Sequence, residues 1–191
     1  MTEGSGREIE IKLPAPSAAQ GRRMLEQAGF LVSRPRVFES NVLYDTAENH
    51  LRQSRQLLRI REVDGECVLT YKGTPDVGRH KSREELEVTL APPGVLERIL
   101  ERLGYRPVFR YEKYRTEFAQ PGAGGVATLD ETPIGVYLEL EGDPDWIDSA
   151  AGNLGFRHQN YILASYAALY FDHCASTGIP PGEGMVFRGP S

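Results

Sequence analysis

Features typical of membrane, exported and nucleic-acid-binding proteins are missing from this chain of 191 residues. It contains no apolar run long enough to span a bilayer, and its start lacks the charged-then-apolar pattern of a signal sequence. Its net charge is −5, so the composition shows no excess of basic residues for binding nucleic acid. We therefore expect a soluble, cytoplasmic protein that binds neither membranes nor nucleic acid.

Cysteine and histidine are also scarce. The two cysteines, Cys67 and Cys174, lie far apart and show no Cys-x-x-Cys spacing, which argues against a zinc site or a disulfide. We expect both to be free or buried thiols. The four histidines lack ligand spacing too, and we expect them in turns or at the surface: His50, His80, His158 and His173.

The apolar fraction of 40% and the charged fraction of 26% are those of a globular protein. The length suits one domain with a sizeable core. We predict a single domain over residues 1–175. The remaining segment, 176–191, is rich in Gly and Pro and is expected to form either a flexible tail or a strap.

Charged and isoleucine residues alternate in a short pattern near the start, Glu-Ile-Glu-Ile-Lys at 8–12. Successive side chains of a strand point to opposite faces, so Glu8, Glu10 and Lys12 share one face and the isoleucines share the other. Taken alone, such a strand is most simply an antiparallel strand with one solvated face.

The same sorting recurs along the chain. Leu-Arg-Ile-Arg at 58–61 places two guanidinium groups on one face, and the stretches 83–90 and 137–141 repeat the acidic version. A solvated face rarely sorts its charges this cleanly. The recurrence therefore indicates several strands with one charged and one apolar face.

Alternation and turn residues together predict the following strands: 8–13, 30–38, 39–45, 58–61, 67–72, 81–90, 110–118, 127–130 and 136–141. Asp64-Gly65 predicts a hairpin between two of them. Helices are predicted at 17–29, 95–103, from 143 onwards and at 161–174, with a helical turn at 51–54. Ser17 and Gln20 form a capping-box pattern at the first helix.

Roughly eight such strands with covering helices predict an α+β fold. If the sheet closes into a barrel with helices outside, the charged faces line its interior. That interior would contain Glu8, Glu10, Lys12, Arg59, Arg61, Lys72, Arg83, Glu85, Glu87, Lys113, Arg115, Asp130, Glu139 and Glu141. Because unpaired buried ions cost several kcal/mol each, such a barrel has to hold water, ions and a ligand. A polyanion bound by Arg and Lys, with a divalent cation bound by carboxylates, satisfies both sets of charges.

Several motifs of this sequence resemble the CYTH superfamily, also called the triphosphate tunnel metalloenzymes. They are Glu-x-Glu-x-Lys at 8–12, Leu-Arg-Ile-Arg at 58–61, Thr-Tyr-Lys-Gly at 70–73, Arg-Glu-Glu-Leu-Glu at 83–87, Lys-Tyr-Arg at 113–115, Leu-Asp at 129–130, Glu-Leu-Glu at 139–141 and Ser-Tyr at 165–166. The match covers about residues 7–172 in the expected order. It implies an eight-stranded antiparallel closed β-barrel, with helices packed outside, that binds a triphosphate.

The resemblance also implies roles for single residues. The implied ligands of Mg²⁺ or Mn²⁺ are Glu8, Glu10, Asp130, Glu139 and Glu141, while Glu85 and Glu87 either bind metal or pair with neighbouring arginines. The implied triphosphate-binding residues are Lys12, Arg59, Arg61, Lys72, Arg83, Lys113 and Arg115. Lys12, Glu8 and Glu10 are the expected catalytic residues, with Lys12 or a carboxylate assisting deprotonation of the attacking water.

Three functions fit these expectations. The first is a metal-dependent triphosphatase acting on tripolyphosphate, thiamine triphosphate or a nucleoside triphosphate. The second is a class IV adenylyl cyclase, which additionally needs a base and ribose pocket that the sequence does not identify. The third is a sensor that binds without turnover, which is disfavoured because a binder would need only the cations. The oligomeric state stays open, with a homodimer as one candidate.

Two further assignments follow from parity and position. Lys81 lies on the inward parity of its strand but beside a loop, which suggests a role in substrate gating. Trp146 is expected to anchor a helix to the core, and Ser165-Tyr166 to dock the last helix rather than take part in chemistry.

Overall fold

The computed structural model describes residues 4–90, 93–182 and 184–188. Its strands are β1 (Gly4–Ala15), β2 (Leu31–Asp45), β3 (Leu57–Val63), β4 (Glu66–Lys72), β5 (Lys81–Leu90), β6 (Arg106–Ala119), β7 (Val126–Thr132), β8 (Gly135–Glu141) and β9 (Gly184–Met185). Its helices are α1 (Ala18–Gln27), α2 (His50–Gln53), α3 (Pro93–Arg102), α4 (Pro144–Asn153), the short 3₁₀ helix η1 (His158–Asn160) and α5 (Tyr166–Thr177).

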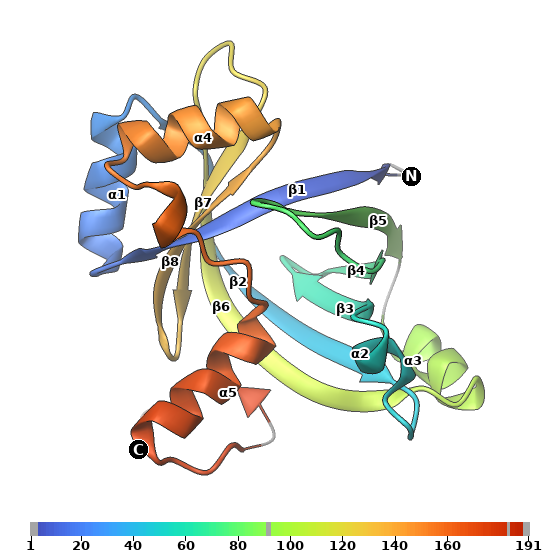
Figure 1. Cartoon of the computed structure of the whole chain (residues 1–191). Helices are drawn as coiled ribbons and strands as arrows, with labels where there is room; N and C mark the ends of the chain where they lie inside the picture. Colours follow the sequence, from blue (N-terminus) through green and yellow to red (C-terminus); the bar gives the residue numbers. More distant parts are fainter. Residues whose placement is uncertain (1–3, 91–92, 183, 189–191) are drawn as a thin grey trace.

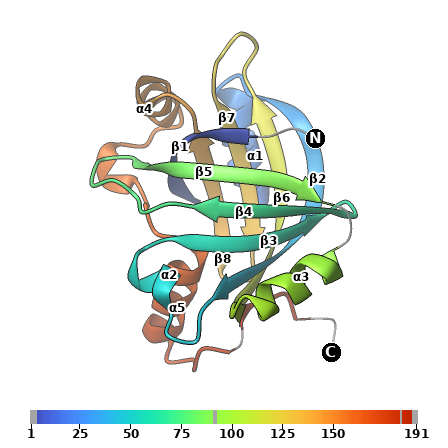
Figure 2. The same cartoon turned by 90° about the vertical axis from the view of Figure 1, so that its right-hand side faces the viewer.

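Eight of these strands close into an antiparallel barrel, which confirms the predicted α+β fold class. The order around the barrel is β2-β3-β4-β5-β1-β8-β7-β6, and pairing of β2 with β6 closes it. Figure 2 shows β3, β4 and β5 across the front of the barrel, with β7 and β8 crossing behind them. The ninth strand, β9, adds to β6 in parallel at Arg110 and Tyr111.

The helices lie outside the barrel and cover its apolar faces (Figure 1). α1 and α4 pack with Ile11, Leu13 and Leu138 in the largest core cluster. α1 approaches closely because Gly21 has no side chain; a Cβ there would lie 2.8 Å from Leu129 Cδ1. α5 and the segment around Met185 cover one end of the barrel. No helix within the described ranges has the length and apolar character needed to cross a membrane.

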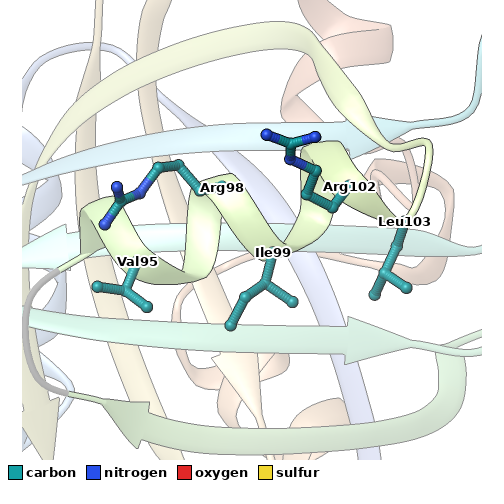
Figure 3. A pocket seen from close by; sticks show the side chains of 5 residues that line it. All are labelled: Val95, Arg98, Ile99, Arg102 and Leu103. Atoms are coloured by element: carbon teal, nitrogen blue, oxygen red, sulfur yellow. The ribbon is translucent and has the colours of Figure 1, made fainter.

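α3 covers a second part of the wall. Its Leu96 and Leu100 pack against Ile60 and Cys67. Val95, Ile99 and Leu103 project along one flank of the helix and stay at least half exposed, while Arg98 and Arg102 project along the other (Figure 3).

The predicted strand pair at 30–38 and 39–45 is wrong, because both stretches belong to the single strand β2. No turn residues separate Phe38 from Glu39. The strand pairs with β6 along its whole length, and register shifts between Val32 and Val37 accommodate Pro35, which lacks a ladder donor. The long, bent β2 thereby reaches both ends of the barrel.

The last helix begins later than predicted, at Tyr166 rather than near residue 161, with Ser165 as its N-cap. The preceding residues have a different role. Ile162 exchanges two backbone hydrogen bonds of 2.9 Å with Lys12, so this segment adds a bridge to the edge of β1. The structure therefore places Ile162 beside the edge of β1, while residues 158–160 form the short helix η1.

The chain after α5 returns to the barrel. Met185 is 1% exposed and packs with Phe109, Tyr111 and Tyr166, while the Phe187 amide donates to Glu112 at 3.0 Å. This part of the 176–191 segment lies against β6 as a strap would. Residues 183 and 189–191 of that predicted segment lie outside the described residues.

We predict that Met185→Ala destabilises the fold by about 2–5 kcal/mol, because it removes a fully buried side chain beneath the aromatic cluster. Val186, the next residue, is 38% exposed, and Val186→Ala should cost less than about 0.5 kcal/mol. Urea denaturation of both variants measures the difference. Equal stability of the two variants would show that β9 contributes nothing to the barrel.

Candidate active site

The barrel encloses a cavity of about 290 Å³, which we call the tunnel, and its lining is strongly charged. Eight cationic side chains line it: Lys12, Arg59, Arg61, Lys72, Lys81, Arg83, Lys113 and Arg115. Seven carboxylates line it as well: Glu8, Glu10, Glu85, Glu87, Glu117, Glu139 and Glu141. All four lysines of the chain are in this set, so every lysine points into the tunnel.

The structure brings the sequence-predicted site residues together. All of them line the tunnel except Asp130, which is completely buried in the wall directly beneath two cations. Asp130 accepts from Lys113 at 2.8 Å, from Arg115 Nε at 2.7 Å and from the Tyr166 hydroxyl at 2.7 Å. In this arrangement Asp130 positions cations rather than facing the cavity, while its implied role as a metal ligand stays a prediction.

Glu8 and Glu10, on β1, are each held by two cations. Glu8 accepts from Lys72 and from Arg83, the latter at 3.2 Å. Glu10 accepts from Lys81 at 2.5 Å and from Lys12 at 3.2 Å. Burial opposes the charge of Glu10, but the neighbouring lysines outweigh it and hold the pKa of this carboxyl well below its usual range.

Lys12 and Lys81 differ although both contact Glu10. Burial disfavours the charge of Lys12, yet Glu10 and Glu139 raise its pKa above the ordinary value. Burial lowers the pKa of Lys81 to about 8, against the attraction of Glu10. Lys12 is therefore a fixed ammonium group at neutral pH, which argues against its predicted part in deprotonating water.

Carboxylates are in excess on one side of the tunnel. Glu141, the last residue of β8, lines the tunnel and is accessible to solvent, and it makes no ion pair within the described part of the chain. Partial burial and the negative charges of Glu8, Glu85 and Glu10 raise the pKa of Glu141. A cation bound here would relieve this repulsion.

Three arginines lie close together on the opposite side, Arg59, Arg61 and Arg115, and two of them share Glu87. Burial and the neighbouring charges of Arg59 and Arg115 lower the pKa of Arg61, although Glu39 and Glu87 counteract them. Arg59 donates to Tyr111 at 3.2 Å and to Thr70 at 3.1 Å, which fixes its guanidinium group. An anion placed between these arginines would stabilise them.

Sequence reasoning missed two charged or polar residues of the wall, Glu39 and Asn41 on β2. Glu39 is 2% exposed, and Lys113, Arg115 and Arg61 lower its pKa to about 2 despite its burial. Asn41 is fully buried, and its amide has no partner among the described residues. Period-two alternation over 39–45 places both inward, so the signal was present in the sequence.

From the sequence, Tyr166 is expected only to dock the last helix. In the structure it also contacts residues of the tunnel. Its ring lies 5.2 Å from the ammonium groups of both Lys12 and Lys113, and it lines the tunnel. Its hydroxyl donates to Asp130, as described above. Lys81 is buried and donates to Glu10, and its suggested role in substrate gating stays a prediction.

The donor set fits a hard divalent cation by its chemistry. Nowhere in residues 4–90, 93–182 and 184–188 do three His, Cys, Asp or Glu groups already converge as metal ligands. The carboxylates are instead neutralised by lysines, and small rotations of long side chains would exchange these partners for a metal. Carboxylate oxygens of Glu8, Glu10 and Glu141 are the ligand type that Mg²⁺ or Mn²⁺ prefers.

A second hollow, of about 400 Å³, runs along the outside of α3 (Figure 3). It is lined by Val95, Ile99 and Leu103 together with Arg98 and Arg102. This lining has no carboxylate and no buried polar group. It therefore lacks the paired charges that distinguish the tunnel.

The chain is similar to known proteins over most of its length. The sequence model described as CYTH domain matches residues 6–160. The protein named "Putative adenylate cyclase MJ0240" from Methanocaldococcus jannaschii is 28% identical over 135 residues, which are 70% of this chain and 75% of that protein. The PH1819 protein of Pyrococcus horikoshii OT3 superposes with a TM-score of 0.70 at 26% identity, covering 86% of this chain and 98% of its own.

A structure from Hippeastrum shares the fold as well. It is described as "Putative adenylyl cyclase HpAC1 from Hippeastrum reveals a dominant triphophatase activity". Its TM-score is 0.63 at 20% identity, and the match covers 88% of this chain and 96% of that one.

Glu39 generates a prediction for stability against pH. Its pKa falls from 4.5 to about 2 on folding, so its contribution is fully present above about pH 4.5 and is lost as the pH falls towards 2. Glu39→Gln should destabilise the protein by about 3 kcal/mol at pH 7, and the deficit should shrink as the pH falls to 3. Urea titrations across this range measure it.

Glu62→Gln is the matched control, because Glu62 lies exposed on the outer face of β3. It should follow the wild type at every pH. A deficit of Glu39→Gln that stays constant from pH 7 to pH 3 would contradict the buried ion network around Glu39.

Proposed function

The chain belongs to the CYTH domain family, and from this premise we propose that it is a divalent-metal-dependent triphosphatase. The substrate would be a triphosphate held in the tunnel, and the products an orthophosphate and the corresponding diphosphate. Mg²⁺ or Mn²⁺ is the proposed cofactor.

The segregation of charge inside the tunnel is the observation that carries the proposal. The carboxylates beside Glu141, which is unpaired within the described residues, favour a cation, and the neighbouring guanidinium groups of Arg59, Arg61 and Arg115 favour an anion. A metal triphosphate supplies both charges in one ligand. Phosphoryl transfer needs little beyond such positioning and neutralisation.

The charged residues of the tunnel have different proposed roles in binding and catalysis. Arg59, Arg61 and Arg115 would bind phosphate oxygens, with Lys72, Arg83 and Lys113 as further cationic groups. Glu8, Glu10, Glu139 and Glu141 would hold the cation, which when bound neutralises phosphate charge and orients water. Water oxygen would bond to the terminal phosphorus while the bridging P–O bond breaks. The water proton would pass to a carboxylate of the site, with Glu10 as the proposed acceptor, because Lys12 already carries its proton.

The names of relatives favour two reactions. The Hippeastrum structure is described as revealing a dominant triphosphatase activity, which supports hydrolysis. The Methanocaldococcus jannaschii name supports adenylyl cyclase as the second candidate. A cyclase also has to hold adenine and ribose. The aromatic residues of the tunnel lining, Tyr111 and Tyr166, already contact cations: Tyr111 accepts from Arg59, and the Tyr166 ring lies against Lys12 and Lys113. Hydrolysis is therefore the primary proposal.

A product assay tests the proposal. Tripolyphosphate, thiamine triphosphate and ATP are offered in parallel with Mg²⁺, with Mn²⁺ and with EDTA, while orthophosphate, pyrophosphate and cyclic AMP are followed. Metal-dependent orthophosphate release without cyclic AMP is the expected result. Cyclic AMP together with pyrophosphate would establish the cyclase instead, and absence of turnover in all conditions would refute both.

We predict that Glu10→Gln lowers kcat at least about 100-fold, because it removes a carboxylate charge from the proposed metal site. Glu84→Gln is the control, since Glu84 is exposed on the outer face of β5. Steady-state kinetics over a series of Mg²⁺ concentrations measures the effect. Wild-type activity of Glu10→Gln would remove Glu10 from the metal site.

Arg59→Ala tests the anion side. Loss of a buried guanidinium group that contacts phosphate should raise KM roughly tenfold or more, which corresponds to a charge-assisted hydrogen bond. Arg110→Ala is the control, because Arg110 is exposed on β6 and its side chain pairs only with Glu112 in the described structure. Unchanged KM and kcat for Arg59→Ala would exclude Arg59 from substrate binding.

A further inference from the structure

Asp148, on α4 outside the tunnel, is the centre of a hydrogen-bond cluster. Its carboxylate contacts His80 Nε2 at 2.7 Å, accepts from the Tyr161 hydroxyl at 2.9 Å and from Arg79 at 3.4 Å, and lies 3.3 Å from His158 Nε2. These groups come from the β4–β5 loop and from the segment between α4 and α5. One carboxylate therefore joins three separate parts of the chain.

Two members of the cluster, His80 and Asp148, are largely covered, whereas Arg79 and His158 are more than half exposed. The His80 side chain is 13% exposed and that of Asp148 is 25% exposed, which corrects the expectation that His80 lies at the surface. The His80 and His158 rings lie 6.0 and 5.2 Å from the Tyr161 ring. Burial opposes the Asp148 charge, but hydrogen bonds from His80 and Tyr161 outweigh it and keep the pKa of Asp148 below its ordinary value.

Two residues that directly follow members of the cluster in sequence pair with tunnel-lining residues of β1. Lys81 follows His80, and it is the first residue of β5 and the partner of Glu10 across the sheet. Ile162 follows Tyr161 and bridges to Lys12 through two backbone hydrogen bonds. The cluster thus lies one residue from each of these pairings.

Both pairings use the same edge of β1. β8 occupies the other edge from Glu10 to Ala15, so β5 and then Ile162 follow one another on the remaining edge. At this junction no continuous strand holds the wall together. Figure 1 shows the segment between α4 and α5 passing across β1 and β8 at this level.

We propose that Asp148 is a positioning residue, which through His80 and Tyr161 holds Lys81 and Lys12 in place around Glu10. The inference rests on the proposed function in so far as these ammonium groups serve the reaction. Asp148 itself touches no tunnel-lining side chain in the described contacts. It acts by fixing two backbone segments. One is the β4–β5 loop, which leads into Lys81, and the other is the segment that leads into Ile162, the backbone partner of Lys12.

Lysine acetylation read by mass spectrometry tests the proposal, because the four lysines all line the tunnel and report on it separately. Asp148→Ala should raise the labelling rates of Lys81 and Lys12 roughly tenfold relative to those of Lys72 and Lys113. Asp145→Ala is the matched control, since Asp145 is exposed on the same helix. It should label as the wild type does.

Tyr161→Phe is a second, milder variant that keeps the ring and removes only its hydrogen bond to Asp148. It should raise labelling of Lys12 more than that of Lys81, because Tyr161 adjoins the Ile162 bridge. If Asp148→Ala fails to fold, this variant decides. Unchanged relative labelling of both lysines in a folded variant would overturn the proposal.

Kinetics separates positioning from a purely structural role. For the substrate found in the product assay, Asp148→Ala should lower kcat roughly tenfold while KM changes less than about threefold, since Arg59 and Arg61 on the opposite wall are untouched. Raised labelling with kcat equal to that of Asp145→Ala would overturn the positioning role. If the wild type turns over no triphosphate, the proposed function fails while labelling still decides the effect of Asp148 on the lysines.

Discussion

Mutual neutralisation of charges inside a closed barrel is the constraint on which the rest of this structure depends. Eight cations and seven carboxylates line the tunnel, with Glu39 and Asp130 buried behind them. Any one of these ions alone would cost several kcal/mol to bury, so each needs partners of the opposite sign at close range. The sheet register supplies such partners, because the two inward carboxylates of β1 lie directly opposite Arg83 and Lys81 of β5.

The tunnel charges are not all neutralised to the same extent, and this difference supports the proposed function. Glu8 and Glu10 are each satisfied by two cations, whereas Glu141 has no ion pair within the described residues and Arg61 shares Glu87 with Arg59. Arginine also serves the surface, but lysine occurs only in the tunnel. A lysine is a mobile point charge that can leave one carboxylate for another partner, whereas the planar guanidinium group suits fixed recognition of an anion. Under the proposed function, lysines would exchange partners when the substrate enters, while arginines would hold its phosphates.

Much of this could be predicted from the sequence. Alternation along 8–12, 58–61 and 83–90 places each charge on one face, and the covering helices follow from the apolar faces. Glu39 was missed because β2 was divided at Phe38, where no turn residue marks a break. The Asp148 cluster left no signal at all, since contacts between a loop, a helix and an irregular segment have no period. Ile162 likewise pairs with Lys12 only through backbone atoms, for which any residue would serve.

The central claim is that the tunnel charges exist to hold a polyphosphate. Calorimetric titration with tripolyphosphate, pyrophosphate and orthophosphate, at constant ionic strength and with Mg²⁺ present, tests it most directly. The account predicts saturable one-to-one binding of tripolyphosphate, clearly weaker binding of pyrophosphate and little or none of orthophosphate, because a longer anion spans more of the cationic wall. Equal affinity for all three anions, or no binding of any, would contradict it.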